Sequence, residues 1–191
     1  MSAGVTGCIL AGGRGRRLGG ALKPLLVVDG ERIVDRQRRV LAPRVDELLI
    51  ALAEADGPLA ALGLPVVVDR HPGAGPLAGV DAALAARARP WLLVVAGDMP
   101  DVRGEVLDAL LAARAPDVDA VVPRVHGYPE PLLALYALTA AAPIARALAD
   151  GRRKTQAILA ELRVRWLDEP DLRALDPDLA SFRNINAPTD R

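Results

Sequence analysis

The chain has 191 residues, of which 51% are hydrophobic and 25% are charged, and its formal net charge at pH 7 is zero. This length and composition predict one globular domain over residues 1–191 and exclude a disordered chain, and the balanced charge excludes a general affinity for nucleic acid or membrane surfaces. The one cysteine, Cys8, excludes a disulfide framework. Because there is also no signal-peptide pattern and no apolar run long enough to span a bilayer, we expect a cytoplasmic protein, and we expect it to be a monomer.

The first predicted element is an apolar strand over Val5–Leu10, which ends at a loop rich in glycine and positive charge. Glycines such as Gly12 and Gly13 allow backbone N–H groups to converge on phosphate oxygens, and Arg17 and Lys23 are among the cations that supply charge. These features predict a phosphate-binding loop. A surface turn that is rich in Gly and Arg is the alternative.

Two other glycine motifs are excluded by their spacing. A Walker A loop requires Ser or Thr after its lysine, whereas Pro24 follows Lys23. A dinucleotide-binding fingerprint requires glycine at position 18, which is occupied by Leu18. Without this fingerprint, the sequence gives little support to a dehydrogenase that binds a dinucleotide.

The rest of the chain alternates between apolar strands and helices. The pattern predicts strands at 25–28, 48–52, 66–69, 91–96, 120–123, 131–136 and 164–167, and helices at 33–41, 58–62, 77–84, 103–114, 140–149 and 155–162. Uninterrupted apolar strands separated by helices predict an α/β fold with a mostly parallel sheet that is covered on both faces. The stretch after residue 167 is rich in Pro and Asp, and we predict a connection there without regular structure.

Asp98 lies just beyond the apolar stretch 91–96, at the place where open α/β sheets bind their ligands. A lone carboxylate there suits Mg²⁺, which accepts one or two protein carboxylates and completes its shell with phosphate oxygens and water. The alternative is that Asp98 caps the next helix. A cap is also the better interpretation of Asp101.

Polar residues at two other places fit the same nucleotide site. Asp69 ends a predicted strand, and its two oxygens can accept the ring N–H and the exocyclic amine of guanine, a donor pair that adenine and cytosine lack; a solvated acid is the alternative. Asn184 and Asn186 share a face if residues 183–186 are extended with Ile185 inward. Their amides would then reach a metal, its waters or a phosphate, and a plain turn is the alternative.

Taken together, four stretches of this chain resemble the MobA-like nucleotidyltransferases, the molybdenum cofactor guanylyltransferase family. They are Leu10-Ala11-Gly12-Gly13 with Arg17, Leu18, Gly19 and Lys23; Asp69 with Gly75-Pro76-Leu77-Ala78-Gly79; Gly97-Asp98-Met99-Pro100; and Asn184-Ile185-Asn186-Ala187-Pro188. Leu18 replaces the usual Met, Gly15 stands where the family often has Ser, and Ala187 replaces Thr. Ala51 stands where the family often has Asn, which weakens the prediction of guanine specifically.

The resemblance implies a Rossmann-like three-layer α/β/α nucleotidyltransferase fold, with a nucleotide-binding part at about residues 1–100 and an acceptor-binding part at about 101–191. It implies transfer of GMP from GTP to Mo-molybdopterin with release of pyrophosphate and with Mg²⁺ as cofactor. By the same resemblance Lys23, Arg17 and Asp98 would be catalytic, and Asp98 and Asn186 would contact the metal. The residues implied to bind the nucleotide are Leu10, Ala11, Gly12, Gly13, Lys23, Asp69, Gly75, Gly79 and Asp98.

The charge run Arg152-Arg153-Lys154 has two interpretations, a solvated surface or a site for the anionic acceptor. The resemblance favours the acceptor site, together with Tyr128 and Asn184. It also implies transient contact with cofactor-insertion or molybdoenzyme proteins. Two other functions stay open: a related enzyme that uses CTP or another phosphorylated acceptor, and a nucleotide-binding regulator without turnover.

Overall fold

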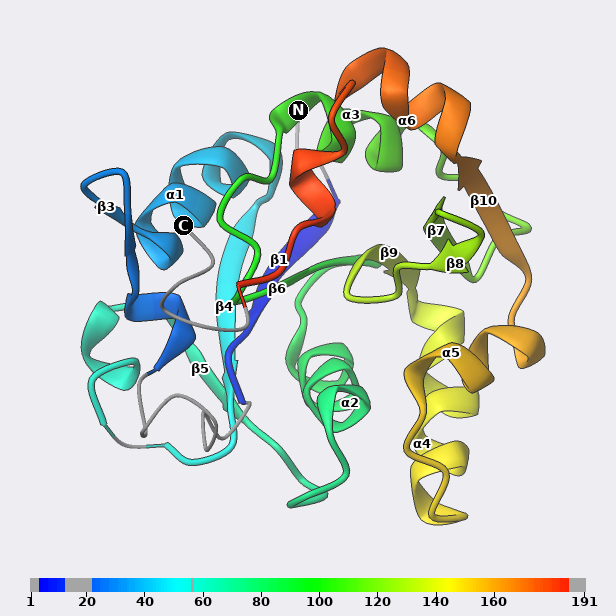
Figure 1. The fold of residues 1–191 in the computed structure, drawn as a ribbon. Coiled ribbons are helices and arrows are strands. Elements are labelled where there is room, and N and C mark those ends of the chain that lie inside the picture. Colours follow the sequence, from blue (N-terminus) through cyan, green and yellow to red (C-terminus); the bar gives the residue numbers. More distant parts are fainter. Residues whose placement is uncertain (1–3, 13–21, 56, 186–191) are drawn as a thin grey trace.

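The structure, a computed structural model, describes residues 4–12, 22–55 and 57–185. Its centre is a mixed eight-stranded sheet with the order β10-β7-β9-β6-β1-β4-β5, in which β8 pairs with β7 (Figure 1). The strands of this sheet are β1 (Val5–Leu10), β4 (Glu47–Leu52), β5 (Val66–Val68), β6 (Trp91–Ala96), β7 (Ala120–Val125), β8 (Tyr128–Pro129), β9 (Leu133–Ala137) and β10 (Val164–Asp168). A separate hairpin pairs β2 (Val27–Val28) with β3 (Glu31–Arg32).

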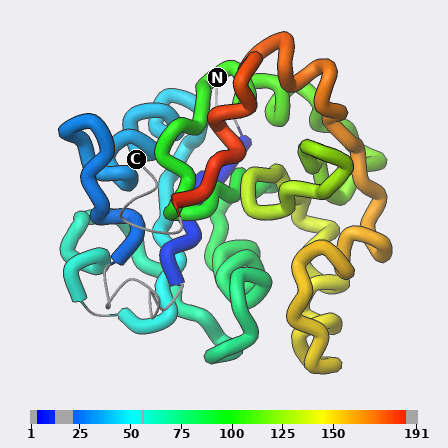
Figure 2. Tube along the Cα trace, in the orientation of Figure 1, coloured from blue at the N-terminus to red at the C-terminus, as the bar shows by residue number. Residues whose placement is uncertain are grey.

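Helices cover both faces of the sheet, as Figures 1 and 2 show. One face carries α1 (Ile33–Leu41), α3 (Gly104–Ala112) and α6 (Glu169–Leu175), and the other carries α2 (Pro76–Ala86), α4 (Ala141–Ala149) and α5 (Thr155–Ile158). The predicted three-layer α/β/α fold is therefore confirmed. Within the described residues, no helix has the length and apolar character needed to cross a membrane.

Side chains that alternate along the strands build two cores, one on each face of the sheet. In β6, Leu93 and Val95 belong to the core under α1 and α3, whereas Leu92 and Val94 belong to the core under α2 and α4. Burial of each such side chain contributes about 1.5–3 kcal/mol, so the fully apolar strands predicted from the sequence are the main source of stability. Cys8 lies in the second core, where burial raises the pKa of its thiol to about 12, so it is not a nucleophile.

The sheet is parallel except where β8 and β9 enter it. β1 runs parallel to β4 and β6, and β4 runs parallel to β5. β9 is antiparallel to both of its neighbours, β6 and β7. The carboxyl ends of β5, β4, β1 and β6 therefore meet at one edge of the sheet, and the beginning of β9 lies at the same edge.

Four predicted segments differ from the structure. The predicted strand at 25–28 begins in the 3₁₀ turn Lys23–Leu25, and only Val27–Val28 forms a strand, β2 of the separate hairpin. The stretch after β10 forms the helix α6 and is not an irregular connection, because Pro170 is tolerated in a first helical turn and Glu169 and Asp171 favour a helix N-terminus. The predicted helix at 58–62 is a 3₁₀ turn, Ala60–Leu62, which Gly63 ends with a φ of 73°. The predicted helix at 155–162 divides into α5 and a 3₁₀ turn at Leu159–Glu161.

Candidate functional site

Lys23 and Asp98 meet at the edge of the sheet where β1 and β6 end. The Nζ atom of Lys23 donates a hydrogen bond of 2.8 Å to Oδ2 of Asp98, and both side chains are about three-quarters buried, with 27% and 23% of their surfaces exposed. Lys23 opens a 3₁₀ turn, Lys23–Leu25, in which Pro24 is buried. The two residues that the sequence predicts to act on phosphate and metal therefore share one location.

Gly97 allows this close approach because it has no side chain. Its N–H donates to the carbonyl of Leu10 at 2.9 Å, which joins the ends of β6 and β1. A Cβ atom at this position would lie 2.8 Å from Cγ of Pro24 and 3.0 Å from the carbonyl oxygen of Leu10. Any larger residue would therefore push Pro24, and with it Lys23, away from Asp98.

Gln37 of α1 holds the turn that carries Asp98. It is 2% exposed, and its Nε2 donates 2.8 Å hydrogen bonds to the carbonyl oxygens of both Ala96 and Met99. The turn is thus fixed on both sides of Asp98. Gln37 was not predicted from the sequence, although a single polar residue at an apolar helical position of α1 is a detectable signal.

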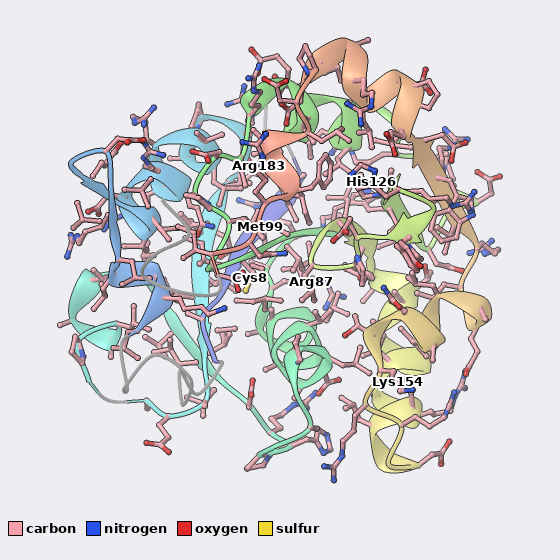
Figure 3. The ribbon with its side chains drawn as sticks, in the orientation of Figure 1. Cys8, Arg87, Met99, His126, Lys154 and Arg183 are labelled. Atoms are coloured by element: carbon pink, nitrogen blue, oxygen red, sulfur yellow. The ribbon has the colours of Figure 1, made fainter. Side chains whose placement is uncertain are left out.

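The C-terminal segment, residues 183–185, bonds to the same turn. The N–H of Ile185 donates to the carbonyl of Asp98 at 2.9 Å, and Ile185 is 6% exposed, as its predicted inward orientation requires. Figure 3 shows Arg183 on this segment beside the stretch that carries Met99. Asn184 is exposed next to it, and Asn186 lies outside the described residues.

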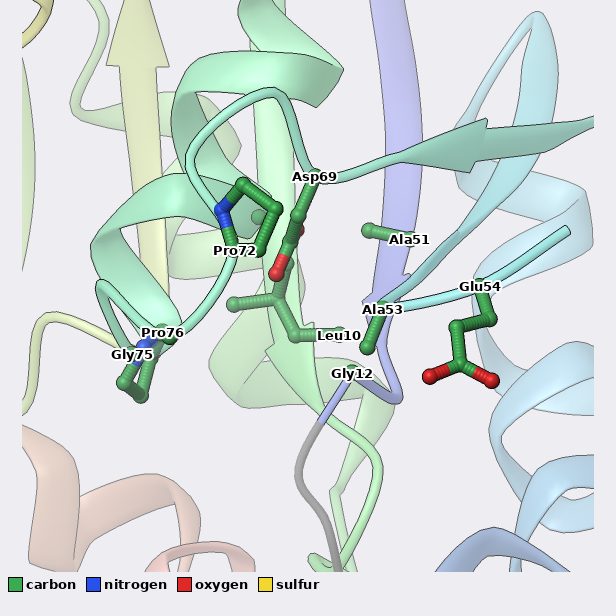
Figure 4. A pocket seen from close by; sticks show the side chains of 11 residues that line it. Leu10, Gly12, Ala51, Ala53, Glu54, Asp69, Pro72, Gly75 and Pro76 are labelled. Atoms are coloured by element: carbon green, nitrogen blue, oxygen red, sulfur yellow. The ribbon is translucent and has the colours of Figure 1, made fainter.

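A pocket of about 680 Å³ opens at the same edge, over β1, β4 and the start of α2 (Figure 4). The residues that line it are Leu10, Gly12, Ala51, Ala53, Glu54, Asp69, Pro72, Gly73, Gly75, Pro76 and Gly79. Five predicted nucleotide-binding residues are in this list: Leu10, Gly12, Asp69, Gly75 and Gly79. Ala11 lies beside the pocket, where its N–H donates to the carbonyl of Ala51 at 2.8 Å, and Gly13 and Arg17 lie outside the described residues.

Part of the pocket wall was not predicted from the sequence, for example Glu54 and Pro72. Glu54 is an acid shortly after the end of β4, and Pro72 and Gly73 lie between β5 and α2. Acids and turn residues that follow strands at this edge are the signal that would have identified them. Ala51 also faces the pocket, so a side chain that could bond to a base is absent at that point of the wall.

Asp69 is an ionisable residue of the pocket wall with a raised pKa and a buried carboxylate oxygen. Figure 4 shows its side chain extending from the end of β5 to a place between Pro72 and Leu10. Its Oδ1 is buried and has no hydrogen-bond partner among the described residues. Burial raises the pKa of Asp69 to about 6, and the nearby charge of His71 lowers it in part.

Two glycines make room for the Asp69 carboxylate. A Cβ atom on Gly12 would lie 3.4 Å from Oδ2, and one on Gly79 would lie 3.5 Å from Oδ1. Gly75 is the N-cap of α2 with a φ of 77°, a conformation that favours glycine. A side chain at position 12 or 79 would therefore contact the Asp69 carboxylate, and glycine leaves the space beside it free.

The predicted acceptor residues are spread over the second half of the chain. Arg152 pairs with Glu161 and, at 3.3 Å, with Asp150, which favours the interpretation of Arg152 as part of a solvated surface. Arg153 donates a long hydrogen bond of 3.4 Å to the carbonyl of Gly73, a residue of the pocket. Tyr128 on β8 is 67% exposed. Figure 3 labels Lys154 on the connection between α4 and α5.

The donor atoms near Asp98 fit a magnesium ion that is shared with phosphates. Among the described residues there is no cluster of three or more His, Cys, Asp or Glu side chains that could hold a metal without a ligand. Asp101 accepts a hydrogen bond of 2.8 Å from Arg36, and the N-cap of α3 is Arg103, so the prediction that Asp101 caps this helix is wrong. One carboxylate with vacant sites for phosphate oxygens and water is a common Mg²⁺ arrangement at nucleotides.

Comparisons with known proteins agree with this geometry. Residues 7–166 match the model of the MobA-like NTP transferase domain. The chain is 36% identical over 184 residues to a molybdenum cofactor guanylyltransferase of Desulfosudis oleivorans, an alignment that covers 95% of this chain and 90% of that protein. It is 37% identical to a probable molybdenum cofactor guanylyltransferase of Chloroflexus aggregans, an alignment that covers 97% of this chain and 91% of that protein. The crystal structure of molybdopterin-guanine dinucleotide biosynthesis protein A from Archaeoglobus fulgidus superposes with a TM-score of 0.80 at 34% identity, covering 97% of this chain and 94% of that one.

Proposed function

Because the chain belongs to the MobA-like NTP transferase family, and is a nucleotidyltransferase, we propose that it transfers GMP from GTP to Mo-molybdopterin. The products would be the guanine dinucleotide form of the cofactor and pyrophosphate. The named relatives support the substrates, and the site supports the reaction type. We assign the nucleotide to about residues 1–100 and the acceptor to about residues 101–191.

The observation that carries the proposal is the position of Asp69 relative to the Lys23–Asp98 pair. All three residues lie at one edge of the sheet, and Asp69 lines a pocket of about 680 Å³ there. Oδ1 of Asp69 is buried without a partner among the described residues, a state that costs free energy until a ligand supplies a donor. The ring N–H and exocyclic amine of guanine would satisfy both carboxylate oxygens at once.

The reaction requires alignment and charge neutralisation more than proton transfer. The acceptor phosphate is already anionic near neutral pH, so its attack on the α-phosphorus needs no general base. Lys23, with Arg17 from the loop outside the described residues, would neutralise the departing pyrophosphate. Asp98, held by Gln37 and Ile185, would supply the carboxylate for Mg²⁺. When bound, the ion would screen the charge that develops on the reacting phosphates.

A panel of nucleoside triphosphates tests the proposal. Each triphosphate is incubated with Mo-molybdopterin and Mg²⁺, pyrophosphate release is measured, and the dinucleotide product is identified by mass. We expect GTP to be the preferred donor. A preference for CTP would overturn the guanine assignment, which rests on Asp69 because Ala51 has no side chain that can bond to a base. GTP binding without product would indicate a nucleotide-binding regulator.

A further inference from the structure

The stretch that begins with Asp98, residues 98–103, is bonded at both ends to residues 181–185. At one end the carbonyl of Asp98 accepts the N–H of Ile185 at 2.9 Å, and at the other end the N–H of Arg103 donates to Oγ of Ser181 at 3.0 Å. The two stretches run side by side in opposite directions, one green and the other red in Figures 1 and 2. The position of residues 181–185 therefore fixes that of the stretch with Asp98.

Ser181 is itself held by Asp176, the residue that ends α6. Both residues are 0% exposed, and the N–H of Ser181 donates to Oδ2 of Asp176 at 2.7 Å. Oδ1 of Asp176 lies 3.1 Å from Nε of Arg103, whose backbone N–H bonds to Ser181. One buried carboxylate therefore holds residues from both stretches.

The carboxylate of Asp176 is matched to these partners. Burial alone raises its pKa, but hydrogen bonds from Ser181 and from the N–H of Ala180, together with the charge of Arg103, bring the pKa below its ordinary value. A buried carboxylate is costly unless it is bonded and paired in this way. A movement of Ser181 or Arg103 away from Asp176 is therefore opposed.

A strained residue lies between Asp176 and Ser181. Leu179, the N-cap of the 3₁₀ turn Ala180–Phe182, has a φ of 52°, which residues with side chains rarely adopt. Its side chain is buried, and its N–H donates to the carbonyl of Asp176 at 2.9 Å. Strain of this kind persists only where the surrounding structure holds the residue, and it is concentrated near functional sites. Here it lies where the chain leaves α6 for residues 181–185.

We propose that Asp176 and Ser181 are positioning residues for the metal-binding carboxylate of Asp98. They hold residues 181–185 in place, so that the N–H of Ile185 fixes the start of the stretch 98–103 while Ser181 fixes its end. Gln37 holds the same turn from α1, and the turn is thus supported from two sides. Groups that hold a metal ligand in place affect the affinity for the metal. The inference rests on the proposed function, because it takes from it the role of Asp98 toward Mg²⁺.

The effect of Mg²⁺ on GTP binding tests the proposal without turnover. The Kd for GTP is measured by calorimetry without acceptor, once in EDTA and once with saturating Mg²⁺, and the ratio of the two values reports how much the ion tightens binding. We expect this ratio to fall about threefold or more in Ser181→Ala, because a support of the metal ligand is lost. The Kd in EDTA should stay the same. Asp176→Asn, which removes the buried charge, should lower the ratio further.

An equal ratio in Ser181→Ala and the unaltered protein would overturn the inference. So would a ratio of one in the unaltered protein, since Asp98 would then hold no ion. Loss of GTP affinity in EDTA would contradict a role confined to the metal. Absence of GMP transfer by the unaltered protein would overturn the proposed function alone, because GTP binding is measured without acceptor.

Thr6→Val is the matched control for a general loss of stability. Thr6 is buried near the start of β1, at the opposite edge of the sheet, and its hydroxyl donates to Glu47. Like Ser181→Ala, this variant removes a buried hydroxyl and should lower the melting temperature. We expect it to leave the Mg²⁺ ratio unchanged. A ratio that falls equally in both variants would assign the effect to stability and overturn the inference.

Discussion

Lys23 forms an ion pair with Asp98, a residue 75 positions further along the chain, with 2.8 Å between Nζ and Oδ2. The pair joins the loop after β1 to the turn after β6. Under the proposed function both residues would act on the same phosphates, Lys23 directly and Asp98 through Mg²⁺, so removal of either should affect the same step of the reaction.

We expect Lys23→Ala to lower kcat by about 10²-fold or more, since one charge that stabilises the developing anion is lost. Asp98→Ala should abolish Mg²⁺-dependent turnover. Steady-state kinetics over a range of Mg²⁺ concentrations measure both effects, and Arg89→Ala, which removes an exposed cation before the start of β6, is the control. Normal rates in both variants would exclude this pair from the active site.

The affinity for GTP should depend on pH through Asp69. Its pKa is about 6, so the carboxylate is ionised at pH 7 and becomes protonated as the pH falls below about 6. Protonation removes an acceptor, and we expect the Kd for GTP to rise between pH 7 and pH 5. Calorimetry on Asp69→Asn corrects for protonation of the phosphates, which is common to both proteins, and this variant should bind weakly with a flatter profile.

The same carboxylate should destabilise the protein without ligand. Since the folded pKa of Asp69 is raised above its ordinary value, the folded state binds more protons, and the contribution of this group to stability increases as pH falls through about 6. Asp69→Asn should therefore melt at a higher temperature at pH 8, and the difference should vanish near pH 4. Thermal denaturation at both pH values measures this, with the exposed Asp178→Asn as control. A lower melting temperature for Asp69→Asn at pH 8 would contradict the prediction.

Gln37→Leu should impair catalysis without changing the Kd for GTP. The substitution removes one donor from the carbonyl of Ala96, which keeps the N–H of Met99 at 3.2 Å, and the side-chain donor from the carbonyl of Met99, whose loss costs about 1–3 kcal/mol. With its turn released, Asp98 should bind Mg²⁺ more weakly. A Mg²⁺ titration of the rate should show a higher half-saturating concentration, and an unchanged value would limit Gln37 to a role in folding.

Gly97→Ala tests the close packing between Pro24 and the end of β6. The added Cβ would lie 2.8 Å from Pro24 and 3.0 Å from a backbone oxygen, so we expect a loss of stability of about 1–3 kcal/mol and a lower kcat. In the control Gly104→Ala, the nearest atoms to the added Cβ belong to the guanidinium of Arg44, which bonds to Asp108 and Val40, so this variant should lose stability without a change in kcat. Urea denaturation and kinetics should separate the two variants.

Most of the sheet could be predicted from the sequence because its strands are continuous apolar runs. Helix α6 was missed because Pro170 and its acids are as frequent in turns as in a first helical turn. The antiparallel direction of β9 was also missed, since an apolar run such as Leu133–Ala137 contains no information on direction.

The candidate site was predictable where one residue carries the chemistry, as for Lys23, Asp69 and Asp98. The contact between Lys23 and Asp98 and the position of Asp69 at the same edge of the sheet are structural findings, and the roles of the three residues stay predictions. Gln37 was not found, because its role depends on carbonyl groups that have no signature in the sequence. Arg17 and Asn186 lie outside the described residues, so their predicted roles stay predictions as well.

The hydrogen bond from Ile185 to Asp98 has a consequence for the order in which this polypeptide matures. A ribosome releases the turn around Asp98 long before it releases Ile185, and the turn stays incomplete until Ile185 has emerged. A product that terminates early, or one trimmed by a carboxypeptidase to before Ile185, would therefore keep most of its sheet and helices while its acid is poorly held.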